Sequence, residues 1–159
     1  LDPESLKSAG VDPAAKVPLK LVGGLSLRSW LELVLDPFGL EARPGDEGLV
    51  IVKAETDPTR REPSKVQKDG ASRIEDVLAK PTTFDFKSVT LEDVAQHFEG
   101  KTEENFVLDP AGRKAGLIDP EAVVSGSAEN VPLREALERL LKPLGLRLVV
   151  KEEVVMITK

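Results

Sequence analysis

The chain contains the same stretch of sequence twice, and this internal repeat constrains its fold more than any other feature. Residues 1–54 align with residues 108–159 almost end to end, with gaps of single residues. Both copies begin with Leu-Asp-Pro, contain a second Asp-Pro further on and end in an apolar strand. The shared positions include Leu27-Arg28 and Leu133-Arg134, Leu31-Glu32 and Leu137-Glu138, and Pro37-x-Gly39-Leu40 and Pro143-x-Gly145-Leu146. Such a repeat defines the structural unit before any single motif does.

A smaller pattern recurs within the repeat. Each of three predicted helices follows a strand and begins with an aliphatic residue, a small cap or proline, and then leucine: Leu25-Ser26-Leu27, Val89-Thr90-Leu91 and Val131-Pro132-Leu133. The elementary unit is therefore a strand–helix–strand segment. Residues 82–159 hold two such segments and a final strand, which predicts an α+β fold in the order βαββαββ. Residues 1–54 hold only a half unit, βαββ, so we expect the chain to begin within a unit.

In the first copy, the pattern predicts a short helix from Asp2-Pro3, a strand over Lys16–Val22 and a turn at Gly23-Gly24. Ser26 is the expected cap of a helix that ends at Pro37. Strands at Leu40–Arg43 and Leu49–Lys53 follow as a hairpin. The expected apolar face of the helix consists of Leu27, Trp30, Leu31, Val34 and Leu35.

In the second copy, Thr90 is the expected cap of a helix, and Asp93 is placed to complete a capping box. Asp109-Pro110 is the expected start of a short helix, as at Asp2-Pro3. The remaining expected elements are strands at Thr83–Ser88, Phe106–Leu108 and Ala122–Ala128, a helix at Pro132–Lys142, and a hairpin of Leu146–Lys151 with Val154–Thr158.

The segment between the copies is polar and charged, with Pro58, Pro63 and Gly70. It has almost nothing apolar to bury, so Glu55–Ser72 is predicted to be a flexible linker, followed by a short helical turn at Arg73–Ala79. The expected organisation is a half repeat at residues 1–54, the linker at 55–72, and a complete repeat at 73–159.

Composition excludes several classes of function. The net charge of −6 is the wrong sign for binding a nucleic-acid backbone. The chain has no cysteine, which excludes disulfides and thiolate metal sites. No apolar run approaches the roughly 20 residues that a membrane-spanning helix needs.

No group of residues predicts catalysis. His97 is the sole histidine, and a helix histidine beside Asp93 is better explained as a surface residue than as a general base. Gly23-Gly24 lacks the further residues of a phosphate-binding loop. The carboxylates near the Asp-Pro pairs lack the spacing of a calcium loop and serve better as helix caps: Asp2, Asp12, Asp109, Asp119 and Glu121. We therefore expect no enzyme activity, no catalytic or metal-binding residue and no cofactor.

The order of these patterns resembles the short domain at the N-terminus of secretins and TonB-dependent receptors, the STN domain. It resembles more closely the tandem copies of that domain in planctomycete-type envelope proteins of unassigned role. The resemblance covers nearly all of the chain outside the linker. It rests on Phe84–Lys87, Thr90–Val94, Asn105–Pro110, Val131–Leu137, Leu141–Leu146 and Val154–Thr158. It implies two helices between two small sheets, a place in the cell envelope or periplasm, and a non-catalytic role in docking other envelope proteins.

The chain departs from the family pattern in two places. The first copy lacks its leading strand–helix–strand segment. The strand before the last helix carries Ser125-Gly126-Ser127 where aliphatic residues usually alternate, so it should be weakly packed or lie at a sheet edge.

Trp30 corresponds to Ala136, and its ring either fills a gap in the core, the favoured interpretation, or is an exposed anchor. The candidate interaction surface is Trp30, Val123, Val124, Ser125 and Ser127.

The leading functional hypothesis is a protein–protein interaction module that accepts a strand at an open sheet edge. A structural spacer is the alternative, and a small-ligand module or enzyme with a cleft between helices and sheets is a third. The expected partner is another envelope protein or a second copy of the chain. The half repeat should expose an apolar face that is covered by an upstream half, by another surface, or by a second copy in a homodimer. This face consists of Val17, Leu19, Leu21, Leu31 and Leu35.

Overall fold

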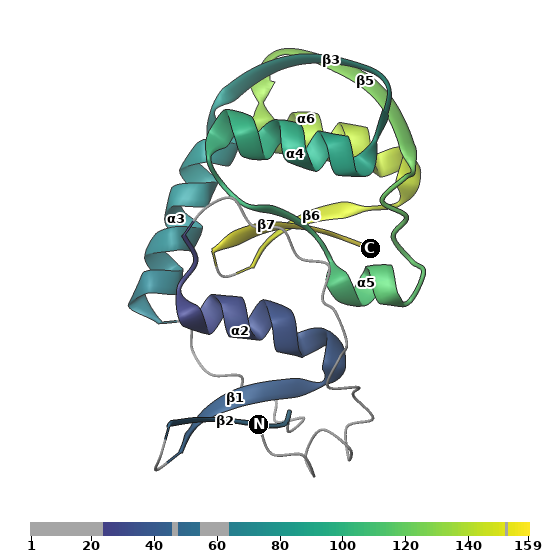
Figure 1. Ribbon diagram of the computed structural model, residues 1–159. Helices are drawn as coiled ribbons and strands as arrows, with labels where there is room; N and C mark the ends of the chain where they lie inside the picture. The colour runs from purple at the N-terminus through teal and green to yellow at the C-terminus, as the bar shows by residue number, and fades with distance from the viewer. Residues whose placement is uncertain (1–23, 46–47, 55–63, 152) are drawn as a thin grey trace.

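The computed structural model describes residues 24–45, 48–54, 64–151 and 153–159. These residues form a mixed α+β fold, as the sequence predicts (Figure 1). The expected strand at Lys16–Val22, the helix from Asp2-Pro3 and the turn residue Gly23 lie outside them. The described elements are α2 (Leu27–Leu35), η1 (Asp36–Phe38), β1 (Leu40–Gly45), β2 (Gly48–Lys53), α3 (Lys65–Ala79), β3 (Pro81–Thr90), α4 (Leu91–Thr102), β4 (Phe106–Leu108), α5 (Pro110–Lys114), β5 (Val123–Pro132), α6 (Leu133–Leu141), η2 (Lys142–Leu144), β6 (Arg147–Lys151) and β7 (Val154–Thr158).

The second repeat places helices α4 and α6 between two small sheets (Figure 1). Strands β3 and β5 pair antiparallel on one side of the helices. The other sheet has the order β4-β7-β6, with β4 parallel and β6 antiparallel to β7. The order β3-α4-β4-β5-α6-β6-β7 confirms the predicted βαββαββ arrangement. The main core lies between these layers and includes Leu91, Val94, Phe98, Leu137, Leu141 and Ile157.

Local signals position these helices as the sequence predicts. Thr90 accepts a hydrogen bond from the backbone N–H of Asp93, and the Asp93 side chain accepts from the backbone N–H of Thr90, which completes the capping box of α4. Asp109 caps α5 by accepting from the backbone N–H of Ala111. Gly145 has a φ of 66°, the left-handed conformation that lets the chain leave η2 and enter the last hairpin.

Helix α3 corrects the predicted linker. The structure has a helix from Lys65 to Ala79, where the sequence indicates a flexible segment up to Ser72. Ser64 caps it, and Gln67 completes a capping box. Its C-terminal half packs Ile74 and Leu78 into the main core of the second repeat. The last part of the expected linker is therefore a structural element of the second repeat.

Both faces of the sheet β4-β7-β6 are buried. Phe106 and Val155 are among the residues that point into the main core between the sheets. On the other face, Val107, Val154 and Met156 pack against Leu33 of α2 in a second, smaller core. Burial on both faces accounts for the uninterrupted apolar run of β7.

Strand β5 extends further than predicted, to Pro132, and pairs only with β3 among the described residues. Gly126 allows the close approach of α6, since an added Cβ would lie 2.9 Å from Leu140 Cδ1. The Ser125 hydroxyl accepts a hydrogen bond from the backbone N–H of Ser88, which sits at an irregularity of β3 with a φ of 55°. None of the helices in the described ranges is long and apolar enough to span a membrane.

Candidate interaction surface

The two hairpins give a direct structural match between the repeats. In β1–β2, Ala42 lies opposite Ile51, and in β6–β7, Leu148 lies opposite Ile157. With these pairs as the guide, the two copies run from α2 and α6 to the end of the hairpin without insertion or deletion. Strand Gly48–Val52 therefore corresponds to Val154–Thr158. The apolar runs that close the two copies, Leu49–Val52 and Val154–Ile157, are therefore offset by one residue in the structure.

The face of α6 that forms the core of its own repeat is buried. It consists of Leu133, Ala136, Leu137, Leu140 and Leu141. The same positions on α2 are Leu27, Trp30, Leu31, Val34 and Leu35, the apolar face predicted from the sequence. Leu27 is 63% exposed and Trp30 is 44% exposed, whereas Leu35 is buried. The favoured expectation that Trp30 packs in a core is therefore wrong, because the N-terminal part of this face is exposed on α2, whereas the same part of α6 is buried.

Residues on the opposite face of α2 are buried as well. Ser29 and Leu33 are buried, whereas the residues at the same positions of α6, Glu135 and Arg139, are exposed and form an ion pair. Leu33 packs on the outer face of the sheet β4-β7-β6. Helix α2 thus docks onto the second repeat with the face that is charged and solvated in α6.

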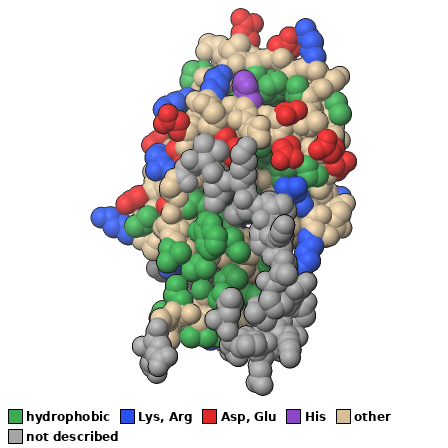
Figure 2. All heavy atoms as spheres, in the orientation of Figure 1, with side chains coloured by type: hydrophobic (Ala, Val, Ile, Leu, Met, Phe, Trp, Pro, Cys, Tyr) green, Lys and Arg blue, Asp and Glu red, His purple; other side chains and the backbone are tan. Residues whose placement is uncertain are grey.

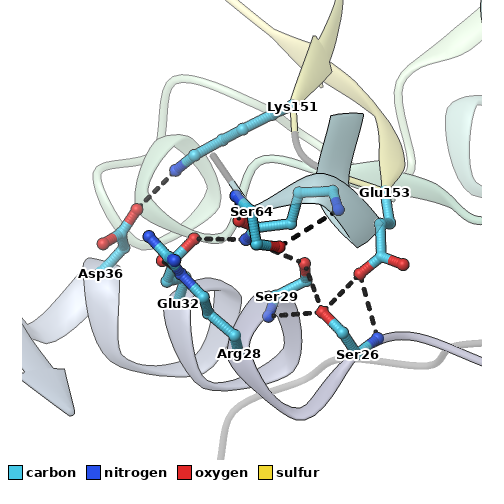
Figure 3. A network of polar contacts seen from close by, with 9 residues as sticks. Ser26, Arg28, Ser29, Glu32, Asp36, Ser64, Lys151 and Glu153 are labelled. Carbon is cyan, nitrogen blue, oxygen red and sulfur yellow. Dashed lines mark hydrogen bonds and ion pairs between the residues drawn. The ribbon is translucent and has the colours of Figure 1, made fainter. Parts of the chain in front are cut away.

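A polar network fixes this docking at the N-terminus of α2. Glu153, beside β7, accepts hydrogen bonds from the Ser26 hydroxyl at 2.6 Å and from the Ser26 backbone N–H at 3.0 Å (Figure 3). The Ser26 hydroxyl also accepts from the backbone N–H of Ser29, as the cap of the helix. A carboxylate at a helix N-terminus interacts favourably with the helix dipole.

Helix α3 also contributes hydrogen bonds to this network. The Gln67 amide donates to the Ser29 hydroxyl at 3.2 Å and to Glu32 Oε2 at 3.3 Å. Gly70 permits the approach of Glu153, because a Cβ there would lie 2.7 Å from Glu153 Cγ. An ion pair between Lys151 and Asp36 joins the two repeats at the other end of α2 (Figure 3). Elements far apart in the sequence therefore form one junction.

The charge of Glu153 is stabilised at this junction. Burial by itself raises the pKa of Glu153. Hydrogen bonds from Ser26 and Ser29, together with the positive charge of Arg73, outweigh burial and hold the pKa of Glu153 below its ordinary value. Arg73 also binds Glu104 through two hydrogen bonds, which fastens α3 to the segment after α4 and raises the pKa of Arg73.

Apolar side chains gather on the outside of the first repeat, over α2 and the β1–β2 hairpin (Figure 2). Leu27 and Trp30 lie on α2, and Leu49 of β2 is 54% exposed. The counterparts of these three residues, Leu133, Ala136 and Val155, are all buried in the core of the second repeat. We call Leu27, Trp30 and Leu49 the open core face.

The structure divides the predicted interaction residues. Trp30 is exposed on α2, whereas Val123, Val124, Ser125 and Ser127 lie on β5, on the far side of the α4–α6 layer (Figure 1). Val123, Ser125 and Ser127 are exposed, but Val124 is buried in the main core and has no surface to offer a partner. The predicted residues therefore do not form one surface.

The sequence patterns did not single out Ser26, Ser29, Gln67 or Glu153 as residues of the junction. One usable signal is the change between copies, since Ser29 and Leu33 replace the charged pair of α6. The amphipathic pattern of α2 identifies its apolar face as the buried one, so it gives no reason to expect a polar residue such as Ser29 to be buried on the opposite face.

The described part of the chain shows no group of three or more His, Asp or Glu side chains arranged to hold a metal ion. His97 is exposed, and its ring packs edge-on against Phe86 and Phe98. No protein-family model matches this chain, and neither a curated protein nor a solved structure matches it.

Proposed function

We propose that this chain is a non-catalytic protein–protein interaction module of a bacterial cell-envelope protein, built from STN-like repeats. The observation that carries the proposal is the open core face. Leu27, Trp30 and Leu49 are exposed at positions whose counterparts in the second repeat are buried. Grouped exposed apolar residues of this kind mark interaction sites in soluble proteins.

The junction between the repeats supports the same interpretation. Because α2 docks with Ser29 and Leu33, its other face is held outward rather than turned toward the second repeat. The network around Glu153 fixes the start of the helix, so the open core face is presented on a rigid support. A rigid support lowers the entropy that is lost when a partner binds.

The expected partner is another protein of the cell envelope. The envelope location comes from the resemblance to secretin and receptor N-terminal domains. The partner's contacting surface should be apolar at its centre, because the exposed side chains of Leu27, Trp30 and Leu49 are mainly apolar.

Site-specific photo-crosslinking in cells of the source bacterium tests the proposal. A photoreactive amino acid at Leu27 or Leu49 should capture a defined envelope protein. The same group at Leu117, an equally exposed leucine in the second repeat, should not. Replacing Leu27 and Leu49 together by serine should abolish capture from a probe at Trp30. Equal capture from Leu117, or none from Leu27 and Leu49, would contradict the proposal.

A structural spacer remains the second candidate, and one observation favours it. Helix α3 contacts the first repeat through Gln67 and packs Ile74 and Leu78 into the core of the second repeat. A flexible linker would argue against a spacer, but residues 64–79 form a structured connection. A spacer should tolerate the Leu27→Ser and Leu49→Ser replacements in the cell without loss of function, whereas an interaction module should not.

A further inference from the structure

The second repeat holds α2 at both ends with charges opposite to those of the helix dipole. Glu153 accepts hydrogen bonds from the hydroxyl and the backbone N–H of Ser26 at the N-terminus of α2 (Figure 3). At the other end, Lys151 forms an ion pair with Asp36. A helix carries partial positive charge at its N-terminus and partial negative charge at its C-terminus, so both ends of α2 meet a complementary charge.

Lys114 of α5 adds to the contact at the C-terminal end. Its ammonium group donates to the carbonyl of Pro37 at 3.5 Å and lies 4.6 Å from the centre of the Phe38 ring. Both residues belong to η1, which continues the chain directly from α2. The second repeat therefore recognises the direction of the helix and not only its apolar side chains.

An apolar strip on the outer face of the sheet lies against the helix. Val107 of β4, together with Val154 and Met156 of β7, packs against Leu33 of α2. The half-buried Leu25, just before the helix, packs against the same cluster. We call the strip and the charges that hold the ends of α2 the helix-binding face, which consists of Val107, Lys114, Lys151, Glu153, Val154 and Met156.

The second repeat has a core of its own beneath this face. Every described residue of the main core lies between Ile74 and Ile157. The contact with α2 adds a smaller core of four buried residues and several polar contacts, among them those of Ser26 and Ser29. Interfaces between units of one chain resemble transient protein–protein interfaces and are more polar than permanent ones. The helix-binding face should therefore persist when α2 leaves it.

We propose that the helix-binding face is a second interaction site, which binds an amphipathic helix of a partner protein in the place of α2. Helix α2 occupies the face in this structure and so acts as an intramolecular competitor that keeps the site closed. The inference concerns a different surface from the open core face and goes beyond the proposed function.

The contacts of α2 specify the partner helix. Its N-cap should be a serine or threonine, because Glu153 accepts from both the hydroxyl and the backbone N–H of Ser26. A small residue should follow at the position of Ser29 and a leucine at the position of Leu33, because both are buried against the second repeat. An acidic residue should end the helix, opposite Lys151.

Helix α6 has an apolar pattern like that of α2 but should not bind this face. Its charged side chains would be buried against the sheet, and a lysine would meet Lys151 where α2 has an acid. At the positions of Ser29, Leu33 and Asp36, the second repeat has Glu135, Arg139 and Lys142. The two repeats therefore supply a matched pair of helices for a test.

The test supplies the helix as a separate peptide to a chain whose own α2 is released. The host is the complete 159-residue chain with Leu33→Arg, labelled with nitrogen-15. Backbone amide signals are followed by NMR, and the expected result is a saturable change centred on Val107, Val154 and Met156. The wild-type chain should bind the same peptide at least about tenfold more weakly, because its own α2 competes at a high effective concentration.

The probe is a peptide with the sequence Gly24–Gly39. Leu27→Gln and Trp30→Lys in the peptide keep it soluble and change only side chains that α2 exposes. The control is a peptide with the sequence Asn130–Gly145, the same segment of the second repeat. It should bind at least about tenfold more weakly than the probe, because it would bury charged side chains.

A charge exchange separates recognition of the helix from apolar adhesion. Lys151→Glu in the host should weaken binding of the probe about threefold, because the acid at the position of Asp36 then meets a like charge. Asp36→Lys in the peptide should restore binding to this host. Unchanged signals of α4 and α6 show that each host is folded. If α2 stays protected from hydrogen exchange in the Leu33→Arg host, Ser29→Glu is added to release it.

Four outcomes would overturn the inference. They are no signal change in a host whose α2 exchanges fast, equal binding of the probe and the control peptide, no response to the charge exchange, and a wild-type dimer in sedimentation that α2 forms by exchange between two copies. Failure of this test leaves the proposed function intact, because crosslinking from Leu27 tests the open core face separately.

Discussion

Glu153, beside the last strand, accepts hydrogen bonds from both the backbone N–H and the hydroxyl of Ser26, at the start of α2 in the other repeat (Figure 3). The two residues are far apart in the sequence, and their contact fixes where the half repeat sits. The carboxylate is buried and also lies beside Gly70 of α3. This one side chain therefore contacts two elements on either side of residues 55–63.

Replacing Glu153 by glutamine should lower the free energy of unfolding by about 1–3 kcal/mol, because charge-assisted hydrogen bonds to Ser26 become neutral ones. Urea unfolding, followed by the fluorescence of Trp30 and by circular dichroism, measures the change. Trp30 is the only tryptophan, so its emission reports the first repeat. The control is Glu138→Gln, the same change at an exposed site of α6, which should stay within about 0.5 kcal/mol.

Acid should weaken the same contact. The folded protein holds the pKa of Glu153 below its ordinary value, so its contribution to stability is complete above the unfolded pKa of about 4.3. That contribution is lost as the pH falls through the folded pKa. The difference in stability between the wild-type chain and Glu153→Gln should thus be constant near neutral pH and shrink below about pH 4.3. A difference that grows in acid would contradict the assignment.

Two glycine-to-alanine replacements in helices should have opposite effects. At Gly70, the new Cβ would lie 2.7 Å from Glu153 Cγ, so Gly70→Ala should destabilise by about 1–3 kcal/mol despite its better helix propensity. At Gly100 of α4, no atom lies within 4 Å of the new Cβ, so Gly100→Ala should stabilise by up to about 1 kcal/mol. Thermal unfolding of both variants measures the contrast. Equal shifts would show that Glu153 does not approach α3 closely.

Leu33 should be the residue that attaches the half repeat. Leu33→Arg, which installs the α6 residue, should release α2 from the outer face of the sheet and cost more than about 2 kcal/mol in the Trp30 transition. Hydrogen exchange should then be fast in α2, while α4 and α6 remain protected. The matched variant Leu27→Arg lies on the open core face and should leave this attachment unchanged within about 0.5 kcal/mol. Equal effects of the two variants would refute the docking.

The sequence predicted the second repeat well, because its signals are local. Thr90 with Asp93, Asp109 before Pro110 and Gly145 after η2 each specify a helix end through neighbouring residues. The sequence pattern also placed the two helices and the closing hairpin correctly. The sequence contains a local signal of the same kind for α3, since Ser64 and Gln67 have the spacing of a capping box. The N-terminal half of α3 packs against polar groups, through Gln67 and through Gly70 beside Glu153. Its sequence is therefore polar and contains a glycine, which favoured the prediction of a linker.

The candidate site was less predictable. Trp30 was expected in a core, and Val124 was expected on a surface, and both expectations are wrong. Apolar periodicity identifies which face of a helix is hydrophobic, but it does not identify what covers that face. On α2 both faces carry buried or apolar residues, and only the neighbouring sheet determines which of them is covered.

The sequence by itself determined the repeat, the α+β class and the strand–helix–strand order, because caps, turns and periodicity act between residues close along the chain. The tertiary structure decided that α2 docks through Ser29 and Leu33, that Glu153 holds its N-terminus, and that Leu27, Trp30 and Leu49 face outward. These relationships depend on which surfaces meet in space. Two copies of nearly the same half unit therefore differ in which parts of the same helix are covered: Ser29 and Leu33 are buried in α2, whereas their counterparts Glu135 and Arg139 are exposed in α6.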